Sequence, residues 1–287
     1  MDNKAEVRQF LTTRRAKLTP HDVGMPDFGQ RRVPGLRRGE VATLAGVSIE
    51  YYSKLERGDL SGVSPTILDA IARALRLDHA ERDHLFHLAQ AADGTSALLR
   101  PRRRGRVWSP PPSLTWVLDA ITGAPALVRN GRMDLLATNP LGRAMHASVY
   151  EQTPHGTPNF CRYTFLNDDS HRFYPEWEGA ADTCVAILRT EAGRDPHDKQ
   201  LQSLVGELST LSDEFRQRWN AGNVRYHGAG TKRFHHTAMG ELELAYESMD
   251  LLSEPGLTLT IYAAEPASRT AESLALLACW MTAPITS

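Results

Sequence analysis

The chain has 287 residues, of which 41% are hydrophobic, and a formal net charge of −1. This length is enough for two ordinary domains, each with its own core. No apolar run reaches the length of a bilayer-spanning helix, and residues 1–17 are too charged for a signal peptide, so we expect a cytoplasmic protein with no membrane partner.

The near-neutral total hides a charge difference between the two ends of the chain. Residues 1–107 hold 19 Lys and Arg against 13 Asp and Glu, a net +6, and the remaining residues are net −7. A basic N-terminal part and an acidic C-terminal part are typical of a nucleic-acid-binding module joined to a module of another kind. The three cysteines, Cys161, Cys184 and Cys279, suit a reducing compartment and indicate neither a disulfide framework nor a zinc site.

The first predicted element is a helix over residues 2–18, whose incomplete apolar stripe includes Val7, Phe10 and Leu11. Residues 19–34 contain three prolines and are expected to form an extended loop.

Residues 36–58 predict two short helices joined by a tight turn. Val41 and Leu44 fall at helical spacing and give the first helix an apolar face. Gly46 suits a left-handed helix end, and Ser48 can cap a second helix by accepting a backbone N–H bond. A helix, a glycine-containing turn and a second capped helix make up the helix-turn-helix pattern.

An ordinary αα-hairpin in a helical core would satisfy the same pattern, but three features favour a DNA-binding motif. The second helix turns Tyr52 and Leu55 inward and leaves a polar, basic outer face. A further helix over residues 66–75 follows at once. Arginines also cluster just ahead of the motif, at Arg31, Arg32, Arg37 and Arg38.

The same stretch resembles the xenobiotic-response-element family of bacterial regulators. The family pattern is met by Ala45, Gly46-Val47-Ser48, Tyr52, Ser53 and Glu56-Arg57-Gly58. Residues 19–34 correspond to a characteristic insertion of that family, and Gly39 stands where relatives more often carry Glu. The resemblance implies a recognition helix that enters the major groove of double-stranded DNA.

The expected DNA contacts lie on the recognition helix and at the start of the helix before it. Arg37 and Arg38 are expected phosphate anchors, while Lys54 and Arg57 could contact phosphate or guanine. Glu50 could accept a hydrogen bond from a cytosine amino group, or could exclude non-cognate DNA sites by electrostatic repulsion. The full candidate set is Arg37, Arg38, Ser48, Glu50, Tyr51, Ser53, Lys54 and Arg57. One such helix covers a half-site, so a homodimer is expected.

Helices over residues 66–75 and 78–91 complete an all-α domain that we assign to residues 1–92. Residues 93–113 form a linker rich in arginine and proline. It could be a solvated hinge, or some of its arginines could contact phosphates beside the main site. These arginines are Arg100, Arg102, Arg103, Arg104 and Arg106.

Residues 114–287 are assigned to a second domain of different character. A hairpin is predicted around Asn130-Gly131 with a type I′ turn, because this dipeptide readily adopts two positive φ angles. Alternating residues predict two more strands, over 241–246 and 257–262. The predicted helices span 114–121, 139–148 with Asn139 as its cap, 175–192, 201–211, 212–219 and 270–281.

A hairpin, a block of helices and a strand meander favour an α+β fold in which helices cover one face of an antiparallel sheet, as in PAS-like sensors. Residues 110–267 also resemble the ligand-binding domain of MmyB-like regulators. The stretches that carry this resemblance are 128–130, 136–139, 173–177, 204–209, 215–219, 230–236 and 240–244. His235 and Thr237 depart from the family pattern, where relatives usually carry Arg and Pro.

The sequence shows no catalytic constellation, and we expect neither an enzyme nor a cofactor. His235 and His236 are adjacent on a predicted strand, so their side chains point to opposite faces and cannot converge on one metal ion. There is no glycine-rich phosphate loop after a strand and no Gly-x-Ser-x-Gly motif.

The resemblance to MmyB-like regulators implies a small apolar ligand in the second domain, an acyl-chain molecule such as a fatty acid. Such a site needs an apolar tunnel and a cationic or polar group for the acid. Arg162, which lies among aromatic residues, is the expected acid anchor. The candidate lining residues are Trp177, Phe215, Trp219, Leu244 and Tyr246, although plain core is the favoured interpretation of the aromatic ones.

The chain is therefore expected to be a sequence-specific DNA-binding transcription regulator controlled by that ligand. The alternative is a DNA-binding regulator whose second domain serves only dimerisation or contacts with a protein partner. A closed, filled core without a cavity would favour this alternative.

Overall fold

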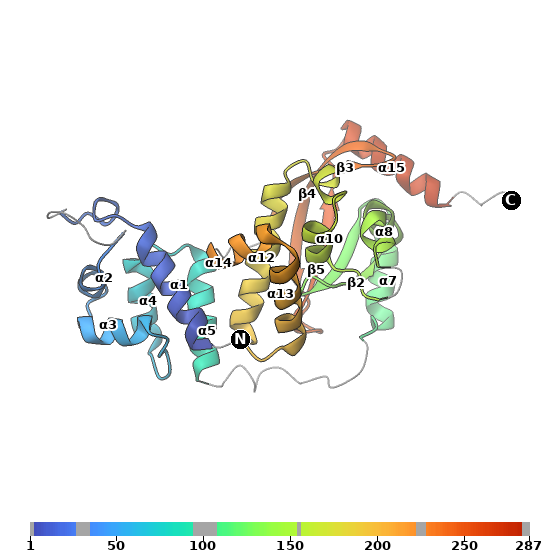
Figure 1. Ribbon diagram of the computed structural model, residues 1–287. Helices are drawn as coiled ribbons and strands as arrows, with labels where there is room; N and C mark the ends of the chain where they lie inside the picture. The colour runs from blue at the N-terminus through green and yellow to red at the C-terminus, as the bar shows by residue number, and fades with distance from the viewer. Residues whose placement is uncertain (1–2, 27–34, 94–107, 154–155, 222–227, 283–287) are drawn as a thin grey trace. The chain divides into compact units, whose positions relative to one another are not determined.

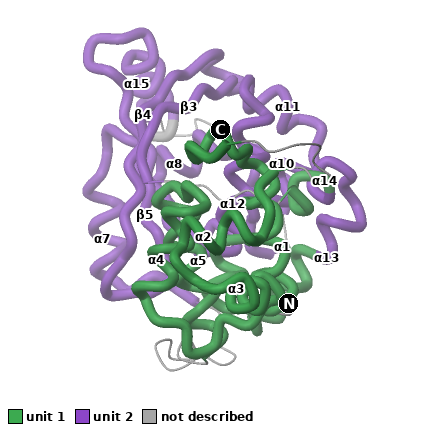
Figure 2. Tube along the Cα trace, turned by 90° about the vertical axis from the view of Figure 1, so that its left-hand side faces the viewer, with its two compact units in different colours: residues 1–102, 189–205, 217–226 green, residues 103–188, 206–216, 227–287 purple. Residues whose placement is uncertain are grey.

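The computed structural model describes residues 3–26, 35–93, 108–153, 156–221 and 228–282. The chain divides into two compact units, coloured separately in Figure 2. Unit 1 comprises Met1–Arg102, Arg189–Val205 and Gln217–Tyr226, and unit 2 comprises Arg103–Leu188, Gly206–Arg216 and His227–Ser287. The boundaries 1–92, 93–113 and 114–287 stay a prediction. No helix within the described residues is long and apolar enough to cross a bilayer.

The described regular elements of residues 1–92 are all helical, as predicted, but the expected extended loop over 19–34 contains a short 3₁₀ helix, and its residues 27–34 lie outside the described part of the chain. The elements are α1 (Asn3–Lys17), the short 3₁₀ helix η1 (His21–Val23), α2 (Arg38–Ala45), α3 (Ile49–Glu56), α4 (Pro65–Ala74) and α5 (His79–Ala92) (Figure 1). Their shared core includes Phe10, Leu36, Tyr52 and Ile71, all fully buried.

The two ends of the recognition helix α3 follow the predicted chemistry. Gly46 closes α2 with a left-handed φ of 67°, and the Ser48 hydroxyl accepts the Tyr51 N–H at 3.0 Å as the cap of α3. Gly58 follows α3 with a φ of 105°, and a Cβ at this position would lie 2.4 Å from the Lys4 carbonyl oxygen. Only glycine therefore lets the chain after α3 pass this close to α1.

Residues 189–205 and 217–226 complete unit 1 around a buried charge. Arg189 is fully buried, donates to the Glu6 carboxylate and to the Trp219 carbonyl, and has its guanidinium 4.7 Å from the centre of the Trp219 ring. Burial raises the pKa of Glu6, although the nearby Arg189 acts in the opposite direction. Removing either charge would leave the other buried without its counter-ion.

Unit 2 combines a sheet with several short helices. Its elements are α7 (Pro112–Ala120), β1 (Ala126–Asn130), β2 (Leu135–Thr138), α8 (Pro140–Met145), α9 (Ala147–Glu151), α10 (Phe160–Leu166), α11 (Ser170–Phe173), β3 (Ala229–His236), β4 (Gly240–Asp250), β5 (Leu257–Ala263) and α15 (Arg269–Thr282). Three further helices, α12 (Trp177–Arg194), α13 (Lys199–Leu211) and α14 (Asp213–Ala221), each contribute residues to both units.

The sheet has the order β2-β1-β5-β4-β3, and every neighbouring pair is antiparallel (Figure 1). The expected α+β domain with an antiparallel sheet is confirmed. Alternation along the strands gives the sheet two different faces. Val128 and Leu259 pack with Leu114 and Leu118 of α7 on one face.

The β1–β2 hairpin is confirmed, but the predicted type I′ turn is wrong. Neither Asn130 nor Gly131 has a positive φ; Met133 takes the left-handed conformation instead, with a φ of 66°. The Asn130 side-chain oxygen accepts from the N–H groups of Arg132 and Asp134, at 2.9 and 3.0 Å. Asparagine here bonds to its own loop, which favours a longer connection over the two-residue turn.

Asn139 is fully buried and joins α8 to the sheet, as well as capping the helix as predicted. Its side-chain oxygen accepts the Gly142 N–H at 2.7 Å and the Ala126 N–H at 2.9 Å. Its amide nitrogen donates to the carbonyls of Ile121 and Ala124. One side chain thus satisfies four backbone groups around the start of β1.

We predict that protonation of His146 destabilises the protein in acid. His146 is buried among the rings of Phe160, Phe173 and Phe234, with Nδ1 3.0 Å from the Gly142 carbonyl oxygen. Burial lowers its pKa from 6.5 to about 4. The unfolded chain therefore binds this proton more readily, and up to about 3 kcal/mol of stability is lost as the pH falls from 6.5 to 4.

The measurement is the urea midpoint as a function of pH in the wild type, in His146→Gln and in His79→Gln, where His79 is exposed. His146→Gln should have a shallower slope between pH 6.5 and 4, and the control should keep the wild-type slope. Equal slopes in all three proteins would contradict the assignment.

Candidate DNA interface and candidate ligand pocket

The outer face of α3 presents polar side chains to solvent. Glu50, Lys54 and Arg57 are exposed, while Tyr52 and Leu55 on the opposite side are buried in the core of unit 1. Tyr51 and Ser53 are half-buried, and the Ser48 hydroxyl is engaged in its cap. This arrangement leaves the tip and one side of α3 able to approach a DNA groove.

The carboxylate of Glu56 organises the positive charges behind this face. Glu56 is 1% exposed and accepts from Arg15 Nε at 2.8 Å, Arg15 Nη2 at 2.9 Å and Arg38 Nε at 3.0 Å. Burial opposes its ionisation, but Arg15 and Arg38 outweigh burial and hold the pKa of Glu56 below its usual value. Glu56 thereby ties the end of α3 to α1 and to the start of α2.

The other candidate cations differ in how they are held. Arg38 keeps a half-exposed side chain despite its bond to Glu56, and Arg37 is exposed at the start of α2. Lys54 lies 3.3 Å from Asp59, with both side chains about half exposed, so this pair contributes little stability and leaves the ammonium accessible. Arg31 and Arg32 lie outside the described residues, as do the linker arginines Arg100, Arg102, Arg103, Arg104 and Arg106.

Unit 2 contains a cavity of about 30 Å³ between its sheet and the helices α10 and α12. Its apolar wall includes Leu127, Met133, Phe160 and Phe234, and its polar wall includes Arg129, Thr164, Cys184, Lys232, Thr260 and Tyr262. The space is enough for one or two water molecules. Unit 2 thus has a water-sized space in its core, not the apolar tunnel that was expected.

Two cations line this cavity, and the structure shows no ion pair for either among the described residues. Arg129 is 7% exposed, and among the described residues its guanidinium forms one long hydrogen bond, of 3.5 Å from Nη1 to the Asn130 carbonyl. Lys232 has its ammonium 5.0 Å from the centre of the Tyr246 ring. Burial lowers the pKa of Arg129, and burial together with Arg129 lowers the pKa of Lys232 to about 8.

A family model described as the MmyB-like transcription regulator ligand binding domain matches residues 110–277, more than half of the chain. The chain belongs to the MmyB-like transcription regulators. A second model, a helix-turn-helix domain, matches residues 6–85. This MmyB-like regulator thus has double-stranded DNA as one partner and a small molecule as the other. Among curated proteins none matches the chain.

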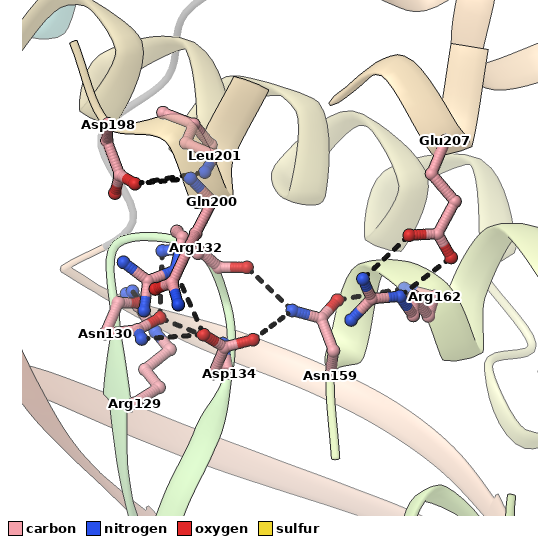
Figure 3. Close-up of polar contacts among 10 residues, drawn as sticks. All are labelled: Arg129, Asn130, Arg132, Asp134, Asn159, Arg162, Asp198, Gln200, Leu201 and Glu207. Atoms are coloured by element: carbon pink, nitrogen blue, oxygen red, sulfur yellow. Dashed lines mark hydrogen bonds and ion pairs between the residues drawn. The ribbon is translucent and has the colours of Figure 1, made fainter. Parts of the chain in front are cut away.

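The cavity of this MmyB-like regulator is lined by none of the six residues predicted for ligand binding. Arg162 instead forms two hydrogen bonds to Glu207, from Nε at 2.9 Å and from Nη2 at 2.7 Å (Figure 3). Its backbone N–H donates a hydrogen bond to the side-chain oxygen of Asn159. An arginine that already has a carboxylate partner must give it up to hold an acid, so its role as anchor stays a prediction.

The predicted aromatic residues are buried around other partners. Trp177 donates from Nε1 to the Thr164 carbonyl at 3.1 Å, and Phe215 packs edge-on against Phe165. Trp219 belongs to unit 1, where its carbonyl accepts from Arg189. The remaining two, Leu244 and Tyr246, are buried side chains of β4. These residues form packed core in the structure described here.

Sequence reasoning missed Lys232, although a usable signal was present. Phe234 and His236 are buried, and Lys232 is in phase with both along β3. On a strand this phase places the lysine on the covered face of the sheet. Arg129 gave a weaker signal, because all five residues of β1 are buried and the strand shows no alternation.

We predict that Lys54→Ala weakens binding to any duplex and flattens its salt dependence. An exposed lysine on α3 is expected to neutralise one phosphate, so the slope of log affinity against log salt should fall in magnitude by about 1. Fluorescence anisotropy with a mixed-sequence duplex measures both quantities. The matched control is Arg82→Ala, which removes an exposed cation from α5. If Lys54→Ala retains the wild-type slope, the phosphate contact is refuted.

Proposed function

We propose that this MmyB-like regulator binds operator DNA as a homodimer under the control of an apolar acid, such as a fatty acid, held in the cavity of unit 2. The DNA contacts would come from the exposed face of α3 and from Arg37 and Arg38. The ligand carboxylate would lie between Arg129 and Lys232. The observation that carries the proposal is that buried Arg129 and half-buried Lys232 line one cavity without a carboxylate partner among the described residues.

Two like charges beside one partly enclosed cavity are unfavourable without a counter-ion. Each loses hydration on burial, and each lowers the stability of the other's charged form. A ligand carboxylate would offset both effects and accept hydrogen bonds from both groups. Thr164 and Thr260 offer further polar partners, while Leu127 and Phe160 would face the apolar part of the ligand.

The size of the cavity sets a condition on this proposal. A space of about 30 Å³ holds a head group at most, so an acyl chain must move neighbouring side chains as it enters. The rings of Phe234, Tyr174 and Tyr262 border the cavity and contact one another. Rotation of these rings would open the space, and ligand binding would then select a more open arrangement of unit 2.

Helix α12 offers a route from ligand to DNA-binding helices. Cys184 of α12 lines the cavity, and Arg189, little more than one turn later, is bonded to Glu6 of α1 within unit 1. A shift of α12 on ligand binding would alter the buried Arg189–Glu6 pair. A coupling free energy of about 1–3 kcal/mol between ligand and DNA is typical of such regulators.

The alternative, in which the second domain only dimerises or binds a protein partner, is favoured by exposed apolar side chains. Trp116 on α7 is 69% exposed, and Trp280 on α15 is 67% exposed. Exposed apolar clusters often mark protein interfaces. The two functions are compatible, but only the first requires an acid in the cavity.

We predict that Lys232→Met weakens dodecanoate binding by about tenfold to a hundredfold, since a hydrogen bond to a charged group contributes about 1.5–3 kcal/mol. Isothermal titration of the full chain measures this affinity, with DNA binding as a check of folding. Arg162→Met is the informative comparison, because it removes the anchor predicted from sequence. Weakened binding in Arg162→Met and unchanged binding in Lys232→Met would refute the assignment. No binding by the wild type would favour the alternative function.

We also predict that dodecanoate affinity falls as the pH rises through about 8. The ammonium of Lys232 is protonated below this pH and can hold an anion, whereas the neutral amine above it cannot. The charged or titratable groups around it are Arg129, Cys184, His146 and Tyr246, with Tyr174 and Tyr262 on the same cavity. Lys232→Arg should bind with little change between pH 7 and 9, because arginine keeps its charge. A fall of equal size in the wild type and Lys232→Arg would contradict the prediction.

A further inference from the structure

Helices α10 and α12 bring two thiols together at the wall of the cavity. Cys184 of α12 lines the cavity and is 3% exposed, and Cys161 of α10 is fully buried. Thr164, one turn after Cys161, lies with its hydroxyl oxygen 3.7 Å from the sulfur of Cys184. Both side chains are free thiols, close enough for each to shift the pKa of the other. Residues that are scattered in the sequence therefore form a dithiol in the fold.

The surroundings of the two sulfurs are unequal. Cys184 shares the cavity with the cations Lys232 and Arg129, and both charges favour a thiolate. The hydrogen bond from Cys161 lowers the pKa of Cys184 against the effect of burial, with help from Thr164 and the two cations. Burial, by contrast, raises the pKa of Cys161 well above its usual value. The geometry thus distinguishes a sulfur that faces two cations at the cavity from a fully buried sulfur on the neighbouring helix.

The cavity suits a small reactant as it stands. Its volume of about 30 Å³ admits a molecule the size of one or two waters, such as hydrogen peroxide, without any movement of side chains. Ala180 and Thr183 line it and are only half-buried, so the wall beside Cys184 lies near the surface of α12. An acyl chain would need the cavity to widen, whereas a peroxide would not.

We propose that Cys184 and Cys161 form a peroxide-reactive dithiol site, in which Cys184 is the nucleophile, Cys161 resolves the intermediate, and Lys232 and Arg129 stabilise the reacting thiolate. This activity goes beyond ligand-controlled DNA binding and does not depend on it.

The reaction proceeds in two balanced steps. The Cys184 thiolate attacks one oxygen of hydrogen peroxide; an S–O bond forms, the O–O bond breaks, and the leaving hydroxide takes up a proton as water. The sulfur is oxidised to a sulfenic acid, and the peroxide is reduced. The Cys161 sulfur then attacks the Cys184 sulfur, an S–S bond forms, and the hydroxyl leaves with the Cys161 proton as a second water.

The test uses the full chain exposed to hydrogen peroxide, then denatured, alkylated with N-ethylmaleimide and analysed by mass spectrometry of intact protein and peptides. The wild type should lose two hydrogens and yield a peptide pair linked through Cys161 and Cys184. Cys161→Ser should stop at a sulfenic acid on Cys184, which dimedone traps. In Cys184→Ser, Cys161 should remain reduced. The exposed Cys279 serves as the internal reference thiol.

The role of Lys232 is tested by the rate at which peroxide oxidises Cys184. Lys232→Met should slow oxidation of Cys184 roughly threefold to tenfold, and Lys232→Arg should retain the wild-type rate. The proposal is overturned if Cys161 and Cys184 stay reduced under conditions that oxidise Cys279 completely. It is also overturned if dimedone labels Cys161 rather than Cys184, or if Lys232→Met reacts as fast as the wild type. The peroxide assay contains no acyl ligand. A negative result in it therefore does not bear on the proposed ligand-controlled DNA binding.

Discussion

The strand register of unit 2 is the constraint on which its cavity depends. Antiparallel pairing places Lys232 opposite Leu244, and Leu127 opposite Thr260, so that these side chains share one covered face. A slip of one residue in β3 would exchange Lys232 for the exposed Arg233. The same slip would replace buried Phe234 with His235 and lose much of the apolar contact. Hydrophobic burial of the sheet therefore places a lysine on its covered face, where the side chain is half-buried, as a consequence of its position.

The buried carboxylate of Glu56 is fully paired and so contrasts with Lys232. Glu56 in unit 1 has two arginine partners, and its carboxylate holds α1, α2 and α3 together. Breaking such a pair leaves the remaining charge buried, at a loss of about 3–5 kcal/mol. Lys232 and Arg129 lack an equivalent partner among the described residues. The paired Glu56 stabilises the fold of unit 1. Lys232 and Arg129 are instead suited to receive an anion or to stabilise a thiolate.

Local signals predicted the elements of this fold well. Ser48 and Asn139 cap the helices they were expected to cap, and the strand alternation of residues 241–246 appears as a buried and exposed pattern in β4. These features depend on neighbours in sequence. The turn at Asn130 was mispredicted because a side-chain hydrogen bond competed with the backbone preference of the dipeptide.

The site itself depends on contacts between distant residues, which single-sequence patterns do not contain. Arg162 appeared to be an unpaired cation among aromatic residues until the fold placed Glu207 beside it. Cys184 lies beside Thr164, one turn after Cys161, only because α10 and α12 pack on the same side of the cavity. Arg189 was unremarkable in sequence and is fully buried against Glu6. The phase of Lys232 along β3 was the one part of the site that the sequence alone could have supplied.

The most direct test of an acid held by Arg129 and Lys232 is amide hydrogen exchange of the full chain, with and without saturating dodecanoate. If Arg129 and Lys232 hold the carboxylate, exchange should slow in β1, β3 and α10 of the wild type. The same elements should show no change in Lys232→Met. Unchanged exchange in these three elements of the wild type at saturation, or equal protection in Lys232→Met, would contradict the assignment of this cavity as the ligand site.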